Sequence, residues 1–426
     1  MKLPSLLTFL CLTSVLYAQQ GPATVTLKAS TDRPEAIYQS GESVTFTVEA
    51  FTDNKPVESG SISCILSKDG IQPQPAKLLP LKDGKAVLTG TLSESGFLSL
   101  KATMEKAQAL AGAGFDPLSI KPSLPVPDDF DSFWNKQKAA LKEVPINPTL
   151  VPVKAAAGVE AFDVKLDCIG APVSGYFGKP KDAKPKSLPA ILTLHGAGVR
   201  SANPNVTSWA LKEGGMLAMD INAHGIPNGE PPAFYENLTN TTLKDYRYEG
   251  RTDREQVYFK AMFLRVIRAI DFLTSQPEWD GKIVIAYGTS QGGFQAFAAA
   301  ALDERVTFFC AGVPAGCDHT GSVAGRVNGW PKFVPTDATG KPDAAILETS
   351  RYIDCVNFAQ RTKCKGAAVT VGFIDVTCPP SSVYAAYNAL NIPKTIYTMP
   401  LAGHSGTPEG YRFMEEAALK HIRDSK

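Results

Sequence analysis

Residues 283–294 read I-V-I-A-Y-G-T-S-Q-G-G-F, and this stretch decides the fold. It joins a buried apolar run to a helix-forming run through Gly288, Ser290 and Gly292. The G-x-S-x-G pattern between a strand and a helix is typical of the nucleophile elbow, a strained turn that exposes a serine hydroxyl at the edge of a sheet. Glycine is needed on both sides because a Cβ would collide where strand and helix pack closely. We therefore predict that Ser290 is a nucleophile and that the N–H of Gln291 helps to form an oxyanion hole.

The chain on both sides of this turn, from residue 128 to the C-terminus, alternates strand patterns with helix patterns. The expected strands are 161–168, 173–179, 190–194, 217–221, 282–287, 306–313, 367–373 and 395–399, and the expected helices are 128–142, 256–275, 295–302, 382–389 and 411–423. This alternation predicts an α/β fold with a doubly wound, mostly parallel sheet, that of the α/β-hydrolases. Ligands in such sheets bind beyond the carboxyl ends of the strands, where residues 226–251 are expected to form a long loop.

A general base is sought after the serine, because the chain order in α/β-hydrolases is nucleophile, acid, histidine. Only His319, His404 and His421 follow Ser290. His319 comes before any later strand that could supply an acid, and His421 lies among charged residues of the last expected helix. His404 lies in a glycine-flanked loop directly after a strand, so we predict that it is the base.

The acid and the second oxyanion donor are expected at the ends of two other strands. Asp375 follows the strand 367–373 and is the predicted acid, whereas no strand leads into the alternative, Asp354. The strand 190–194 ends in H-G-A-G, residues 195–198. The N–H of Ala197 is the predicted second donor, and His195 is expected to be a structural hydrogen-bonding residue.

Residues 19–121 have the pattern of a small all-β domain. Short alternating strands are separated by turn signals such as D-N-K-P at 53–56 and K-D-G at 68–70 and 82–84. This pattern predicts an immunoglobulin-like sandwich, expected to be a spacer or a wall packed against the enzyme. Residues 122–127 form a proline-rich linker, and the catalytic domain comprises residues 128–426.

Residues 1–18 have the features of a signal peptide, with Lys2 before a short apolar run and Ala18 at a plausible cleavage position. The protein is therefore expected to be secreted or periplasmic, and no other stretch is long enough to span a membrane. Export permits disulfides, and Cys310, Cys317, Cys355 and Cys364 are candidates for pairing.

Composition and cysteine spacing limit the possible ligands. The formal net charge of +1 gives no reason to expect a nucleic-acid partner. No C-x-x-C pair occurs, so we expect neither a metal nor a cofactor. The oligomeric state is left open.

Several stretches together resemble the acetyl xylan esterase/cephalosporin-C deacetylase family of carbohydrate esterases over about residues 125–426. The similar stretches are P-D-D-F-D-S-F-W at 127–134, R-A-I-D at 268–271, G-T-S-Q-G-G at 288–293, G-F-I-D at 372–375 and C-P-P-S-S-V-Y-A-A-Y-N at 378–388. The resemblance implies a Ser290, Asp375 and His404 triad, with the N–H groups of Ala197 and Gln291 as the oxyanion hole. This chain departs from the family around the acyl pocket, at Ala197, at 222–225 and at Ser405.

The resemblance implies a serine esterase that removes acetyl groups from acetylated sugars or polysaccharides of the xylan type, through an acyl-enzyme. Two alternatives stay open: a broad carboxylesterase or peptidase of the same superfamily, and an inactive binding protein on a hydrolase fold. The intact triad argues against the inactive protein. Tyr235, in the 226–251 stretch, and Trp330 are predicted to bind the sugar by stacking.

Overall fold

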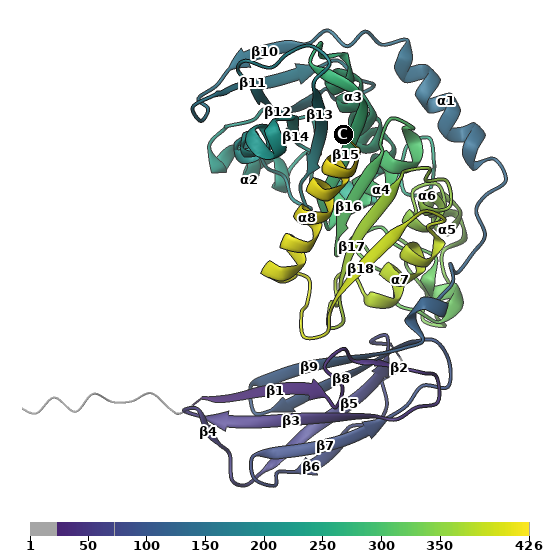
Figure 1. Ribbon diagram of the computed structural model, residues 1–426. Coiled ribbons are helices and arrows are strands. Elements are labelled where there is room, and N and C mark those ends of the chain that lie inside the picture. Colours follow the sequence, from purple (N-terminus) through teal and green to yellow (C-terminus); the bar gives the residue numbers. More distant parts are fainter. Residues whose placement is uncertain (1–23, 72, 426) are drawn as a thin grey trace, which may run out of the picture.

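The computed structural model describes residues 24–71 and 73–425, which form an N-terminal β-domain and a larger catalytic domain (Figure 1). The signal peptide predicted at 1–18 lies outside the described residues. The strands of the β-domain are β1 (Val25–Thr31), β2 (Ile37–Tyr38), β3 (Val44–Thr52), β4 (Lys55–Pro56), β5 (Ser61–Lys68), β6 (Lys77–Pro80), β7 (Lys85–Gly90), β8 (Gly96–Met104) and β9 (Ala107–Phe115), followed by the short helix η1 (Pro117–Ser119).

Two sheets enclose the core of the β-domain. One contains β1, β3, β4 and β7, and the other has the order β2-β9-β8-β5-β6. Strand β3 buries Val44, Phe46, Val48 and Ala50 at alternate positions, and these residues pack with alternate residues of β5, β8 and β9. The period of two buries one face of each sheet. The K-D-G signal at 82–84 lies between strands, the one at 68–70 begins at the last residue of β5, and the second half of D-N-K-P at 53–56 forms β4.

The catalytic domain is built on a nine-stranded mixed sheet. Its strands are β10 (Thr149–Pro152), β11 (Val159–Leu166), β12 (Val173–Pro180), β13 (Leu188–Leu194), β14 (Leu217–Ile221), β15 (Trp279–Thr289), β16 (Phe308–Gly312), β17 (Gly366–Gly372) and β18 (Lys394–Met399). They have the order β10-β11-β12-β14-β13-β15-β16-β17-β18. The pairs among β10, β11, β12 and β14 are antiparallel, and all later pairs are parallel.

Helices cover both faces of this sheet. They are α1 (Phe130–Lys142), η2 (Pro204–Gly214), α2 (Pro232–Asn240), η3 (Tyr246–Tyr248), α3 (Tyr258–Ser275), α4 (Gln291–Leu302), η4 (Gly321–Ala324), α5 (Ala344–Ser350), α6 (Cys355–Ala359), α7 (Pro380–Ala389) and α8 (Pro408–Ser425). Neighbouring strand residues point to opposite faces. Ile191 and Ile285 pack on the face that η2 and α8 cover, whereas Leu192 and Ala286 pack with α3 and α4.

The structure differs from the expectation at several places on the catalytic domain, among them η2, α5 and α6, which were not expected. Residues 226–251 are not one irregular loop, because they contain α2 and η3. Strand β10 was not expected, and it extends the antiparallel edge of the sheet beside β11. A half-buried strand is recognised in a sequence by alternating apolar and polar residues. The T-L-V-P sequence of β10 does not alternate in this way, and all four residues are exposed.

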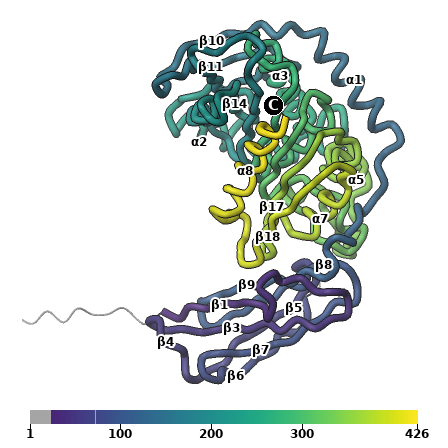
Figure 2. Tube along the Cα trace, viewed as in Figure 1, coloured from purple at the N-terminus to yellow at the C-terminus, as the bar shows by residue number. Residues whose placement is uncertain are grey.

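The β-domain packs against the loop that follows β17, at the carboxyl end of that strand (Figure 2). The ring of Phe97, which is fully buried, lies edge-on against Phe373 at 5.0 Å and near Tyr384 at 5.6 Å. A Cβ added to Gly112 would lie 2.4 Å from the Phe373 carbonyl oxygen. The expected wall against the enzyme is therefore in direct contact with the loop that leads to Asp375.

The segment between the domains also binds to the catalytic domain. The Ser123 hydroxyl donates to Asp318 at 2.7 Å, and the Arg326 guanidinium donates to the Lys121 carbonyl at 2.7 Å. Asn388, on α7, donates to the Ile120 carbonyl at 2.8 Å. These bonds fix the expected linker on the surface of the catalytic domain.

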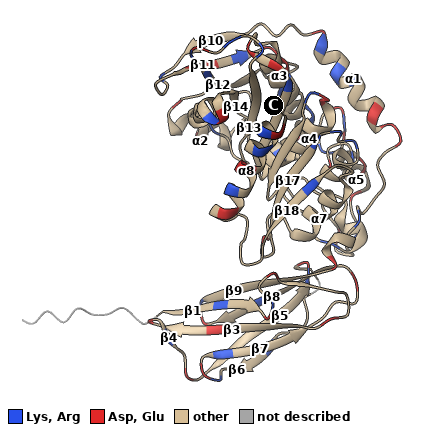
Figure 3. Ribbon diagram, in the orientation of Figure 1, with Lys and Arg blue, Asp and Glu red and all other residues tan. Residues whose placement is uncertain are grey.

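The formal net charge of +1 is the balance of many acidic and basic residues. Acidic and basic residues are interspersed along the chain in both domains (Figure 3). No helix among the described residues is long and apolar enough to cross a membrane. All seven described cysteines are free. The four candidates for pairing are buried thiols, and burial raises the pKa of Cys364 to about 12.

Candidate active site

The elbow around Ser290 is strained and tightly packed. Ser290 joins β15 to α4 with φ 58° and ψ −120°, outside the regions that L-residues prefer. A Cβ on Gly288 would lie 2.2 Å from the Gly292 carbonyl oxygen, and one on Gly292 would lie 1.9 Å from the Leu194 carbonyl oxygen. The predicted need for glycine at both positions is thus confirmed. The strain is held by backbone hydrogen bonds, among them Ser290 N–H to the Gly312 carbonyl at 2.8 Å.

Ser290, His404 and Asp375 lie in hydrogen-bonding sequence although they come from three separate strand ends. His404 Nε2 is 2.9 Å from Ser290 Oγ, and His404 Nδ1 is 2.8 Å from an oxygen of Asp375. The His404 side chain is 31% exposed, whereas that of Asp375 is fully buried. This arrangement leaves the imidazole accessible to substrate while the carboxylate fixes its tautomer, with Nδ1–H donating to Asp375.

The loop after β17 holds the Asp375 carboxylate in place. One carboxylate oxygen accepts the N–H groups of Thr377 and Cys378, both at 2.8 Å, while the other faces His404. The alternative acid, Asp354, has a different role. Asp354 caps α6 and accepts the N–H groups of Asp318 and His319. Among the described residues it has no hydrogen bond to His404. The structure therefore brings Asp375, and not Asp354, to the histidine.

The other two candidate histidines are also accounted for. His319 is fully buried, and burial lowers its pKa to about 3. It packs against Phe294 and Phe333. His421 lies on α8, where its ring stacks on Phe308 and Nε2 is 2.9 Å from the Thr307 hydroxyl. Neither is in hydrogen-bonding contact with Ser290.

The loop after β13 lies directly against the nucleophile. A Cβ on Gly196 would be 3.5 Å from the Cβ of Ser290. His195 Nδ1 lies 2.6 Å from the Gly196 carbonyl, and its Nε2 accepts the N–H of Ala223 at 3.2 Å. This pattern requires a neutral ring that donates from Nδ1, and burial lowers the pKa of His195 to about 4. His195 is a structural hydrogen-bonding residue, as expected, and it orients the loop that carries Ala197.

The buried His224 also contacts the loop that carries Ala197. Its Nε2 lies 3.3 Å from the Gly198 carbonyl, and its Nδ1 lies 2.8 Å from the Tyr258 hydroxyl. Burial lowers the pKa of His224 to about 3, so the ring is neutral and bridges α3 to the loop. The Tyr246 hydroxyl donates to the Gln291 side chain at 2.6 Å.

The roles of His224, Tyr246 and Tyr258 were missed by sequence reasoning. The departure from the family pattern at residues 222–225 was the available signal. This departure could not identify the aromatic neighbours of His224, because Tyr246 and Tyr258 lie 22 and 34 residues further along the chain.

The two predicted sugar-binding residues lie in different settings. Tyr235, on α2, is half-buried, and its hydroxyl donates to the Pro227 carbonyl and accepts the N–H of Glu230. No described contact joins it to the triad. Trp330 is half-buried near Phe259, and its backbone N–H donates to the Thr377 carbonyl at 2.7 Å. Trp330 therefore adjoins the loop of the acid.

Asp375, Cys378 and His404 place their potential metal-ligand atoms within 4.8 Å of one another. The carboxylate and the imidazole are already hydrogen-bonded to each other, and burial raises the pKa of the Cys378 thiol well above its usual range. A thiol that resists ionisation is a poor metal ligand. The donor set therefore fits a hydrogen-bonded acid and base better than a resident metal.

The chain is similar to known proteins over most of its length. The model of the acetyl xylan esterase (AXE1) family matches residues 118–424. The acetyl esterase Axe7A of Xylanibacter ruminicola is 31% identical over 381 residues, which are 88% of this chain and 85% of that protein. Residues 118–426 alone cannot supply this share, so the likeness extends into the β-domain.

Two solved structures each cover more than two thirds of the chain. An acetyl xylan esterase from Paenibacillus sp. R4 is 30% identical with a TM-score of 0.60, covering 73% of this chain and 98% of that one. Acetyl xylan esterase 1 from Thermoanaerobacterium sp. JW/SL YS485 is 22% identical, also with a TM-score of 0.60, and covers 71% of this chain and 97% of that one. The first of these nearly complete matches leaves more than a quarter of the present chain without a counterpart.

Proposed function

Because the chain belongs to the acetyl xylan esterase family and is a carboxylic-ester hydrolase, we propose that it removes acetyl groups from acetylated sugars with Ser290 as nucleophile, His404 as base and Asp375 as acid. The observation that carries this proposal is the hydrogen-bonded sequence Ser290 Oγ, His404 Nε2, His404 Nδ1, Asp375, with distances of 2.9 and 2.8 Å. It is the arrangement required for nucleophilic acyl transfer.

The geometry supports a two-step reaction. His404 accepts the proton of Ser290 as Oγ attacks the acetyl carbonyl, and the buried Asp375 carboxylate stabilises the imidazolium. The N–H groups of Ala197 and Gln291 donate to the developing oxyanion. These donors need not reorganise during the reaction, because His195 orients the loop of Ala197 and Gln291 begins α4. His404 then protonates the departing sugar oxygen. Water, activated by the same histidine, releases acetate from the acetyl-serine.

The proposed substrate is an acetylated polysaccharide of the xylan type. Trp330 supports this assignment, because its backbone is hydrogen-bonded to the loop of Asp375 and the residue is only half-buried. Tyr235 is proposed as a more distant stacking residue on α2. Two further proposals concern the whole protein: the β-domain is an immunoglobulin-like sandwich, and residues 1–18 direct export.

Release of acetate from acetylated xylan by the wild-type protein and by Ser290→Ala tests the proposal. The substitution should reduce kcat to near the uncatalysed rate, because no covalent intermediate forms. The control Ser132→Ala alters an exposed serine on α1, outside both the proposed triad and the acyl pocket. A Ser290→Ala protein that keeps its acetate release would contradict the assignment of the nucleophile.

The acyl specificity is tested with 4-nitrophenyl acetate, butyrate and octanoate. Acetyl should be preferred, since each methylene that a small pocket cannot admit costs on the order of 1–3 kcal/mol. Octanoate cleaved as fast as acetate would instead favour the broad carboxylesterase.

A further inference from the structure

The arginines of the described chain fall into two groups. Nine of them form ion pairs with carboxylates: Arg33, Arg254, Arg268, Arg305, Arg326, Arg351, Arg361, Arg412 and Arg423. Arg200, Arg247, Arg251 and Arg265 have no such partner among the described residues. Arg265 is fully buried and donates to the Ala223 carbonyl, so its role is structural. The other three lie in the two loop regions next to the nucleophile.

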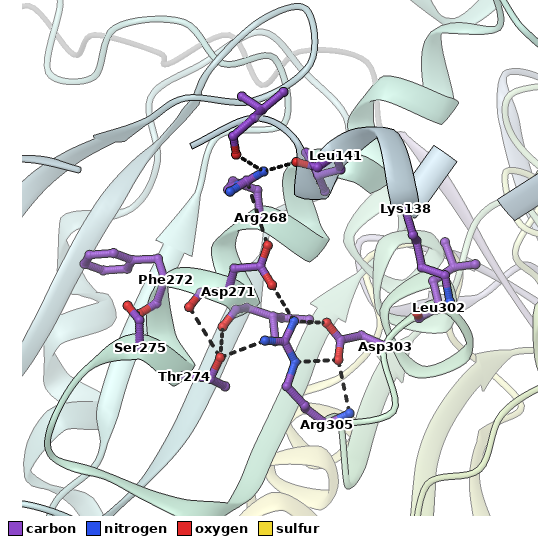
Figure 4. Close-up of polar contacts among 12 residues, drawn as sticks. Lys138, Leu141, Arg268, Asp271, Phe272, Thr274, Ser275, Leu302, Asp303 and Arg305 are labelled. Atoms are coloured by element: carbon purple, nitrogen blue, oxygen red, sulfur yellow. Dashed lines mark hydrogen bonds and ion pairs between the residues drawn. The ribbon is translucent and has the colours of Figure 1, made fainter. Parts of the chain in front are cut away.

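The paired arrangement is the rule elsewhere in this protein. Arg305 contacts both Asp271 and Asp303, at 2.6 and 2.5 Å, and Arg268 donates to the Leu141 carbonyl beside Asp271 (Figure 4). Arg305 thus has carboxylate acceptors on more than one side of its guanidinium, and Arg268 is paired with Asp271 although its Nε has no hydrogen-bond partner. Arg200, Arg247 and Arg251 have no carboxylate partner of this kind among the described residues.

Arg200 is closest to the chemistry. It is exposed, and its Nη2 donates to the Gly196 carbonyl at 2.9 Å. A single Cβ placed on Gly196 would lie 3.5 Å from Ser290 Cβ and 3.7 Å from Arg200 Nη2, so one methyl group would bridge the nucleophile and the guanidinium. Arg200 Nε lies 3.4 Å from His195 Nδ1, whereas Nη1 has no acceptor among the described residues and belongs to an exposed side chain beside the loop that carries Ala197.

Arg247 and Arg251 flank one aromatic ring on the same side of the site. Their guanidinium groups lie 5.0 and 5.2 Å from the centre of the Tyr248 ring. Arg247 Nε is buried without a hydrogen-bond partner. Its neighbour Tyr246 donates to the side chain of Gln291, the residue after the nucleophile. Arg247 is thus linked through the adjacent Tyr246 to Gln291, whose N–H is a proposed oxyanion donor.

A lysine extends this positive rim toward the acid. The Tyr248 hydroxyl donates to the Pro331 carbonyl at 3.0 Å, which places Lys332 next to the same ring. Lys332 also has no ion pair among the described residues. Burial lowers its pKa, while its proximity to Cys378 and Asp375 acts in the opposite direction. Its ammonium group therefore lies near the acid loop.

We propose that Arg200, Arg247 and Arg251 recognise a carboxylate on the carbohydrate, so that the preferred substrate is an acetylated glycan with a uronic acid next to the acetylated sugar. Guanidinium groups suit this task because their planar donors match both oxygens of a carboxylate. Unpaired cations at the mouth of a site also attract anionic substrates over a distance. The inference rests on the proposed esterase function and adds the charge of the substrate to it.

The test compares two disaccharide monoacetates that differ in one group: an acetylated methyl xyloside that carries a neighbouring glucuronic acid, and the same acetylated xyloside with glucose in place of the glucuronic acid. The measured quantity is the ratio of their kcat/KM values, which cancels any general loss of activity. The wild-type ratio should favour the uronate on the order of tenfold at low salt. It should fall toward one as ionic strength rises, because salt screens partly exposed charges. Arg200→Gln, Arg247→Gln and Arg251→Gln should each lower the ratio, and the triple variant should bring it close to one.

Arg412→Gln is the matched control, since Arg412 lies on α8 in an exposed ion pair with Glu409 and should leave the ratio unchanged. A wild-type ratio of one or less, with acetate released from both sugars, would overturn the inference and leave the proposed function intact. If neither sugar releases acetate, the proposed function fails on these substrates. The inference is then decided by inhibition of 4-nitrophenyl acetate hydrolysis: methyl glucuronoside should inhibit at lower concentration than methyl glucoside, and equal inhibition would overturn it.

Discussion

Two loops flank Ser290, and different forces hold them in place. The loop after β13, with Ala197, is oriented by hydrogen bonds from two neutral histidines, His195 and His224. The loop after β17, with Asp375, is covered instead by apolar contact with the β-domain through Phe97. The difference means that the oxyanion side depends on polar groups within the catalytic domain, whereas the acid side depends on a second domain.

The largest expected effect separates the proposed catalytic carboxylate, Asp375, from the structural one, Asp354. Asp375→Asn should lower kcat by roughly 10³–10⁴-fold, because an amide no longer fixes the donating tautomer of His404. Asp354→Asn should lower Tm while the folded protein keeps its kcat, since Asp354 only caps α6 and binds backbone N–H groups. Rates from steady-state kinetics and Tm from calorimetry decide the matter. The opposite pattern would transfer the role of acid to Asp354.

The polar side is tested by His224→Phe, which keeps an aromatic ring beside Tyr246 but removes the bond to the Gly198 carbonyl. We expect kcat to fall on the order of 10–100-fold with a smaller change in KM, because the oxyanion donors lose their fixed position. His421→Phe, on α8, is the matched control for loss of a part-buried imidazole outside the site. An unchanged kcat in His224→Phe would show that the loop keeps its position without this bond.

The apolar side is tested by two equivalent truncations in the β-domain. Phe97→Ala removes the contact with Phe373 and Tyr384, whereas Phe115→Ala removes a buried ring that stacks on Tyr38 inside the domain. Both should destabilise the protein by roughly 3–5 kcal/mol. Only Phe97→Ala should also lower kcat, by up to about tenfold, as Asp375 loses its position. Equal kcat values at a temperature where both variants are folded would make the β-domain a spacer.

The smallest expected effect concerns a buried carboxylate at the domain boundary. Burial raises the pKa of Asp69 to about 6, and weaker interactions with Ser381 and Lys68 lower it. The folded state therefore binds the Asp69 proton more tightly than the unfolded state does, and stability falls as pH rises from about 4 to 6.

Asp69→Asn should consequently gain roughly 1–3 kcal/mol of stability over the wild type above pH 6, where the wild-type carboxylate is charged. Near pH 4 the two proteins should have nearly equal stability. Denaturant unfolding at several pH values measures this difference. A constant difference across the range would contradict the assigned titration.

The sequence alone was enough for local features whose chemistry is complete within a few residues. The elbow at 288–293 could be predicted because only glycine tolerates the close approach of β15 and α4. His404 and Asp375 could be predicted because chain order and strand ends restrict the choice. The buried strands and the long helix α3 follow from apolar periodicity.

Tertiary structure alone decided what the active-site loops touch. His224 meets Tyr258 and Gly198, and Phe97 meets Phe373, through contacts between residues far apart in the chain. Tertiary structure also decided that Arg200 has no carboxylate partner among the described residues, since a sequence does not specify which charges become neighbours. Local patterns fix backbone conformation through short-range sterics and burial, whereas partners across the fold are set only when the strands take their order in the sheet and the β-domain packs against one end of it.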